Sequence, residues 1–210
     1  RRVTDGGTEI ELGDTFQEKL DIRNLVPYEG DYIYQGRWGN TIRLGSTVLN
    51  APIPNTWSKT GEDGDPIMIL KNGQHDESTE PWVPQVEDIN TDLSSIYLTS
   101  TQQIPIDTSA YNTDAFTEPP EAPDQYIKNQ VILNSGRLLF NTNTDSIIIS
   151  SKKNVSINAD KEIGISGEDN VTLLSAEVNL GDLNANQALV LGDDFMTQFE
   201  ILLQNLNNLT

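Results

Sequence analysis

The sequence has no cysteine, few basic residues and no long apolar run, and each shortage narrows what the chain does. Without cysteine, disulfide bonds and thiolate chemistry are excluded. Only 13 Lys and Arg residues face 32 Asp and Glu residues, and the net charge of −19 opposes nucleic acid and anionic membrane surfaces. We therefore expect no nucleic-acid partner. No apolar run approaches the roughly 20 residues of a membrane-spanning helix.

Proline and tryptophan are missing from the C-terminal part of the chain. All ten prolines and all three tryptophans precede residue 124, and the segment "FTEPPEAPD" lies directly before it. Proline fixes φ and lacks the amide donor, so this segment continues neither a strand nor a helix. We predict a domain boundary near residue 124. The chain begins "RRVTDGG" rather than with methionine, and we expect a further segment upstream of Arg1.

Residues 1–123 are predicted to form an irregular, loop-rich region of small β elements that links to or wraps a neighbouring protein. Its short apolar stretches are "DYIYQG", "NTIRLGST", "DPIMILKNGQ" and "SSIYLTST". The pair Asn72-Gly73 predicts a hairpin turn after a strand, since such a turn needs positive φ, and Gly39-Asn40 predicts another. A helix is expected only around "TFQEKLDIRNL", residues 15–25.

Residues 124–192 carry a ladder of aliphatic pairs with a step of eight residues. In "SIIISSKKNVSINADKEIGISGEDNVTLLS" nearly every position between the pairs is polar. Members of a pair lie two residues apart, so they share one face of a strand. Val131 with Leu133 and Leu138 with Phe140 are less regular members. The pair Val178 and Leu180 follows the last regular pair after one step of seven. The residues predicted to form an axial core are Ile147, Ile149, Val155, Ile157, Ile163, Ile165, Val171, Leu173, Val178 and Leu180.

Three arrangements compete for this repeat. Strands at such spacing are typical of an antiparallel meander or sandwich. A single-chain solenoid needs about three units for each turn, which leaves only about two turns to stack. In the third arrangement three intertwined chains each supply one wall of every turn, and the aliphatic pairs fill a shared core. We favour this homotrimeric β-helix or β-prism, because it gives every apolar pair a dry partner.

Residues 193–210 are predicted to form a short helix, with Asp193 or Asp194 as its N-cap. Spacings of four and three residues produce the seam of a coiled coil. The alternative is an amphipathic helix packed on its own domain. A trimeric bundle would share its symmetry axis with the β-prism. The seam residues are Phe195, Phe199, Leu202, Leu206 and Leu209.

Several motifs resemble a known family of proteins. The ladder ending in "ANQALVLGDDF" is similar to the C-terminal needle of the central baseplate spike of contractile-tailed bacteriophages, a family shared with type VI secretion spikes. The stretches "YIYQGRWGNTIRLGST", "NTWSKTGEDGDPIMILKNGQ" and "EDINTDLSSIYLTSTQQIPI" resemble spike-related baseplate proteins of T-even-like phages, especially those that infect cyanobacteria. The resemblance covers roughly residues 28 to 210.

The resemblance implies a homotrimer in the virion, mounted on baseplate hub and tail tube proteins, that helps to puncture the host envelope when the tail contracts. It also implies an OB-fold domain, for which we look upstream of Arg1, and in T-even phages a lysozyme domain, which residues 1–123 do not resemble. Some spikes of this family end in a metal-stabilised point that is built from histidines. Here His75 is the only histidine and lies far from the C-terminal end, so the resemblance implies a separate tip protein there. The alternative is a trimeric tail fibre or receptor-binding adhesin.

No motif predicts a catalytic, cofactor-binding or metal-binding site, and we expect a protein that is not an enzyme. Glu62, Asp63 and Asp65 in "GEDGDP" offer oxygen ligands for calcium, but the full calcium-loop pattern is missing, and a solvated turn is favoured. His75 beside Asp76 is interpreted as the flank of a hairpin, since no nucleophile is placed near it. The three tryptophans are interpreted as core or interface anchors rather than sugar platforms.

Overall fold

The structure is a computed structural model, and its two units are described separately. Contacts divide the chain into residues 1–161 and residues 162–210. The described residues are 3–5, 8–10, 22–57, 62–74, 80, 82–114, 116–176, 178 and 192–208. In the first unit, β1 (Val3–Asp5) and β2 (Thr8–Ile10) pair as a two-stranded antiparallel sheet.

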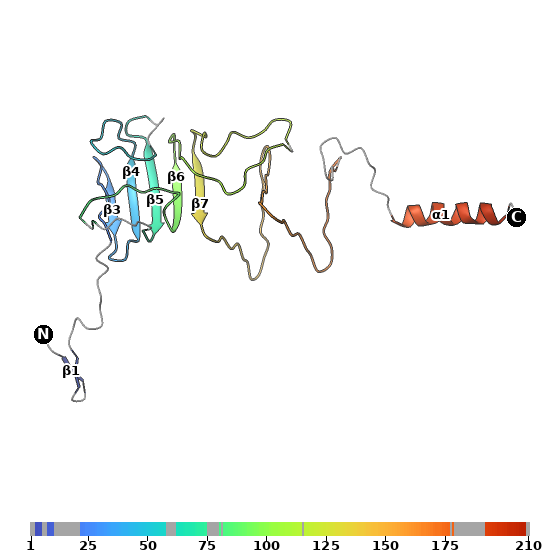
Figure 1. Cartoon of the computed structure of the whole chain (residues 1–210), viewed down its shortest axis with the longest axis horizontal. Helices are drawn as coiled ribbons and strands as arrows, with labels where there is room; N and C mark the ends of the chain where they lie inside the picture. Colours follow the sequence, from blue (N-terminus) through green and yellow to red (C-terminus); the bar gives the residue numbers. More distant parts are fainter. Residues whose placement is uncertain are drawn as a thin grey trace. The chain divides into compact units, whose positions relative to one another are not determined.

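The first unit contains a five-stranded antiparallel sheet in which each strand pairs with the next one along the chain (Figure 1). The prediction of a mainly β protein is confirmed, but the expected irregular region is a regular meander. Long connections hid this order, because strands far apart in sequence pair with one another. The strands are β3 (Tyr32–Gln35), β4 (Thr41–Ser46), β5 (Pro66–Asn72), β6 (Ser94–Thr99) and β7 (Gln130–Ser135).

One of the two predicted hairpins is confirmed and the other is wrong. The turn between β3 and β4 is closed by a hydrogen bond from the amide of Gly36 to the carbonyl of Asn40, and Gly39 has a φ of +83°. Gly73 also has positive φ, +79°, but the chain leaves the sheet there and returns only at β6. The Asn72-Gly73 pair therefore predicted correctly that the chain turns, but it did not predict which segment pairs with β5.

The last strand of the sheet lies beyond the predicted boundary at residue 124. Val131 and Leu133, which were assigned to the ladder, belong to β7 and pair with β6. Most of the predicted helix at residues 15–25 lies outside the described residues. Its described end is not helical, since Leu25 forms an isolated parallel bridge with Gln85. Among the described residues there is one helix, α1 (Gly192–Asn207), in the second unit.

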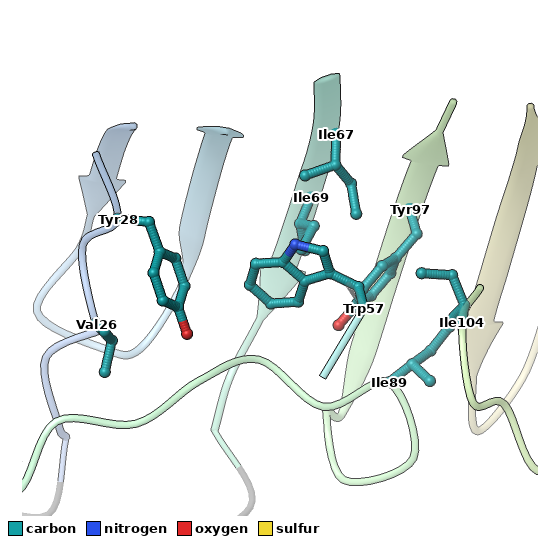
Figure 2. Packing of buried hydrophobic residues seen from close by; sticks show 8 residues of the cluster. All are labelled: Val26, Tyr28, Trp57, Ile67, Ile69, Ile89, Tyr97 and Ile104. Carbon is teal, nitrogen blue, oxygen red and sulfur yellow. The ribbon is translucent and has the colours of Figure 1, made fainter. Parts of the chain in front are cut away.

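One face of the sheet carries the hydrophobic core, and we call it the covered face. Non-strand segments lie over this face and bring Trp57 and Tyr28 against the strands (Figure 2). Trp57 is buried, as expected for a core anchor, whereas Trp38 and Trp82 are exposed. The core consists of Val26, Tyr28, Trp57, Ile67, Ile69, Ile89, Tyr97 and Ile104.

A buried arginine on β4 lies on the covered face. Arg43 donates from Nε and Nη2 to the two carboxylate oxygens of Glu87, at 2.7 and 2.8 Å, and from Nη1 to Asp31. Its guanidinium lies 5.5 Å from the ring centre of Tyr28 and 5.3 Å from that of Trp57. Burial lowers the pKa of Arg43, but the bonds and charges of Glu87 and Asp31 outweigh it, so the pKa rises. The guanidinium therefore stays charged and ties the cover to β4.

A second buried pair joins β5 to the cover. Lys71 Nζ lies 3.1 Å from a carboxylate oxygen of Asp92, and the hydroxyl of Tyr97 donates to the other oxygen at 3.1 Å. Burial raises the pKa of Asp92, and the charge of Lys71 opposes this rise without cancelling it. Burial and the neighbouring Asp92 charge raise the pKa of Tyr97 well above its ordinary value.

The opposite face of the sheet, which we call the open face, is apolar as well. Two rows of side chains cross all five strands on this face, and none of the ten is charged. Tyr32, Tyr34 and Val131 are about two-thirds exposed, at 69%, 65% and 65%. The first row is Tyr34, Ile42, Leu70, Ile96 and Leu133, and the second is Tyr32, Leu44, Met68, Leu98 and Val131.

We expect Arg43→Met to destabilise the sheet strongly. The substitution leaves the buried carboxylates of Asp31 and Glu87 without their cation, and breaking such a pair costs about 3–5 kcal/mol. Urea unfolding followed by tryptophan fluorescence, at one fixed protein concentration, measures the change. Arg37→Met, at an exposed position in the β3–β4 turn, is the control with the same change of side chain. A loss for Arg43→Met no larger than that of the control would contradict a structural role of the buried cluster.

We expect Lys71→Met to make stability fall more steeply as pH rises. The folded pKa of Asp92 is already raised by burial, so the unfolded chain releases this proton first and stability is lost on passing upward through the folded pKa. Removing the Lys71 charge raises that pKa further and widens the window. Unfolding free energies between about pH 5 and about pH 8 measure the slope. The double variant Lys71→Met, Asp92→Asn should lose the extra slope, and its persistence would refute this assignment.

Candidate functional site: the unpaired ladder and the C-terminal helix

The described residues hold no group of three or more His, Cys, Asp or Glu side chains that could bind a metal ion. In the "GEDGDP" turn, Asp63 accepts from the amide of Leu49 at 3.2 Å, and Asp65 accepts from the amide of Glu62 at 3.1 Å and from the hydroxyl of Thr101. These carboxylates close turns around Gly64, whose φ is +89°. His75 and Asp76 lie outside the described residues.

Bends recur along the ladder at about the interval of the sequence repeat. They lie at residues 143–145, 152–153, 160–161, 168–169 and 176, and no helix or strand is assigned between them. The aliphatic pairs 147/149, 155/157, 163/165 and 171/173 each lie between two successive bends. The repeat in the sequence is therefore a repeat of local conformation.

The exposed fractions of the aliphatic side chains repeat along the ladder too. In each unit the first member of the pair is about half exposed and the second is about two-thirds exposed. The first members, Ile147, Val155, Ile163 and Val171, are 52%, 50%, 53% and 51% exposed. The second members, Ile149, Ile157, Ile165 and Leu173, are 73%, 65%, 70% and 68% exposed. Val178 is exposed as well, and Leu180 lies outside the described residues.

The described stretch 137–174 has no strand pairing and no hydrogen bond from one backbone group to another. Figure 1 shows it as a plain trace beyond β7, without arrows. An antiparallel meander would pair neighbouring units within the chain, and this stretch shows no such pairs. Backbone amides and carbonyls that leave water need partners, so burial of the aliphatic pairs requires partners from other strands.

The helix α1 also exposes its apolar side chains. Of the predicted seam, Phe195, Phe199, Leu202 and Leu206 lie on one face of the helix and are each about half exposed, while Leu209 lies outside the described residues. The rings of Phe195 and Phe199 stack at 5.9 Å. The helix begins at Gly192, so the two aspartates proposed as N-cap lie in its first turn instead of before it.

Sequence reasoning missed two sets of exposed apolar residues. Ile148 and Leu174 lie outside the regular pairs and are 85% and 96% exposed. The open face of the sheet was not anticipated either. A signal for it was present, because residues 67–70 are all apolar in "PIMIL", and an uninterrupted apolar run is typical of a strand that is covered on both faces.

A groove of about 720 Å³ lies at one end of the open face. Its apolar lining comes from the first cross-strand row and from Leu138, which follows β7 in the chain. Asn40, Ser94 and Arg137 contribute to its polar lining. Residues of the sheet and of the beginning of the ladder therefore line the same groove.

The protein thus belongs to the mainly β class, and its described residues form an open-faced antiparallel sheet, a repeat without strand pairing and a short C-terminal helix. Comparison with family models, with curated proteins and with solved structures found no match. Within the described part of the chain, no helix is long and apolar enough to cross a membrane.

Proposed function

We propose that this chain is a subunit of a homotrimeric needle, in which three ladders wind around one another and close a shared apolar core. The observation that carries the proposal is the combination of exposed aliphatic pairs and unpaired backbone between residues 137 and 174. Copies of the same chain supply both kinds of partner at once, because every unit offers the same pair at the same interval.

Three copies suit the pattern better than one or two. Each extended segment presents one pair on one side, so it forms a single wall, and three walls are the smallest number that encloses a core. The seam of α1 has the spacing of a coiled coil, which also associates around an axis. A helix of 16 residues is marginal alone in water, so α1 gains stability from the same association.

Such a needle serves a mechanical function. Backbone hydrogen bonds between chains run along the whole length of the rod, so separating the chains requires breaking many bonds at once. Three copies at −19 each carry a formal charge of −57, which favours solubility of the thin rod. Stiffness without a thick core is what axial load on a thin protein demands.

The resemblance to phage spike proteins supports a location for the proposed needle in the virion. We assign it to the tail baseplate of a contractile-tailed virion, below the hub and tail tube proteins, with a separate protein at its tip. It helps to puncture the host envelope during contraction, contacts that envelope only transiently, and is not an enzyme. The alternative, a tail fibre or adhesin, requires binding of host glycans, and a glycan pull-down with the purified trimer separates the two functions.

We expect Ile157→Asp to prevent assembly of the full chain. In the proposed core the substitution places three carboxylates together in a dry environment, and an unpaired buried charge costs several kcal/mol. Sedimentation equilibrium should give the mass of a trimer for the unchanged chain and of a monomer for the variant. Ser156→Asp, one residue away on the other side of the extended segment, is the control and should remain a trimer. A trimeric Ile157→Asp variant would count against the axial core.

We expect Leu202→Ala to weaken the trimer without abolishing it. The seam of α1 is short, so the loss is confined to one layer of apolar contacts, about 2–5 kcal/mol for each buried leucine. Thermal unfolding of the assembled trimer, followed by circular dichroism, should shift to lower temperature. Gln204→Ala lies on the opposite side of the helix and should shift much less. Equal shifts for both variants would remove the support for a coiled coil.

A further inference from the structure

We infer that the open face of the five-stranded sheet is a second interface between copies of this chain, so that three sheets face one another around the axis of the ladder. The inference rests on the proposed trimer and extends it to the N-terminal unit. It assigns to the sheet a role that the ladder alone does not require.

The composition of the open face is that of a buried surface. An antiparallel sheet with one face in water alternates apolar and polar residues, and its solvated face is polar. Here both cross-strand rows are apolar from edge to edge, and Tyr34 and Val131 at the two edges are each 65% exposed. An apolar patch that spans a whole sheet face marks an interaction site.

The size of the face fits an auxiliary interface. Five strands about 4.8 Å apart and about six residues of about 3.4 Å give a face of roughly 480 Å². A stable interface buries about 800 Å² of each partner, so this face alone is too small to hold two copies together. It becomes effective when the copies are already joined, because tethering raises their effective concentration to the millimolar range.

The chain itself provides that tether. β7 carries Leu133 on the open face and ends at Ser135, and Leu138 a few residues later lines the same groove as Leu133. The apolar surface is therefore continuous from the sheet into the first part of the ladder. Copies that wind together from the ladder onward bring their β7 strands, and hence their open faces, toward one axis.

Charge does not oppose a second copy at this face, although two chains of −19 each repel one another over most of their surface. The two rows of the open face contain no charged side chain, and this allows close approach of identical chains. A basic protein would be recognised through carboxylates, and these rows offer none.

The test is photo-crosslinking from the open face in the full chain. Tyr34 and Val131 are replaced, in separate variants, by p-benzoyl-phenylalanine, and the control carries the same group at Ile53, an exposed loop position. Sedimentation first establishes the oligomeric state of each variant. After irradiation, a denaturing gel separates links between chains, which give covalent dimers and trimers, from links within one chain.

We expect several-fold more covalent dimer and trimer from at least one open-face variant than from the Ile53 variant. A trimer whose open-face variants link only within one chain, or link no more than the control, would overturn the inference and leave the proposed needle standing. Links within one chain would assign the cover to another segment of the same chain. A monomeric unchanged chain would overturn the proposed trimer itself, and the inference with it.

Discussion

The need of buried backbone groups for hydrogen-bond partners governs this molecule. In the ladder, the described residues meet neither the need for hydrophobic burial nor the need for backbone pairing, and neither need is satisfied without the other. If the aliphatic pairs packed against an apolar surface that offers no β-strand, the buried backbone amides and carbonyls would lack hydrogen-bond partners. Pairing the backbone in water would leave the pairs exposed. In the proposed trimer, strands from identical chains would meet both needs at once.

In the five-stranded sheet, the backbone groups are paired within the chain, and apolar side chains are buried on the covered face alone. Its strands pair within the chain, and its covered face is closed by loops whose polar groups are engaged by Arg43 and Lys71. Buried ion pairs add little net stability over apolar packing, but their directional bonds fix which loop lies over which strand. The rings of Tyr28 and Trp57, which pair edge-on, both lie against the guanidinium of Arg43.

Sequence reasoning succeeded best where the signal is local and periodic. The heptad spacing predicted a helix that the structure has at Gly192–Asn207, and the step of eight residues recurs as bends at residues 152–153, 160–161 and 168–169, whereas the predicted strands of the ladder stay a prediction. It failed where partners are distant. Asn72-Gly73 predicted a hairpin because a turn signal does not specify its partner strand, and the bond of Arg43 to Glu87 spans 44 positions that no local pattern connects. The open face was missed because the alternating apolar residues of β4 and β6 lie on it, while the covered face holds buried polar residues such as Arg43 and Thr99, so alternation alone does not show which face is closed within the chain.

The open face of the sheet and the aliphatic pairs of the ladder together affect how the proposed needle would carry a load. A load that reaches the proposed needle must pass through the chain between Ser135 and Leu138, where the sheet gives way to the ladder. If only the ladders associated, this short segment of each chain would carry the load alone and would bend. In the proposed assembly, association of the open faces would hold the three copies together before this segment in the chain, and the ladders would hold them together after it. Both contacts would then use one apolar surface that continues from β7 to Leu138.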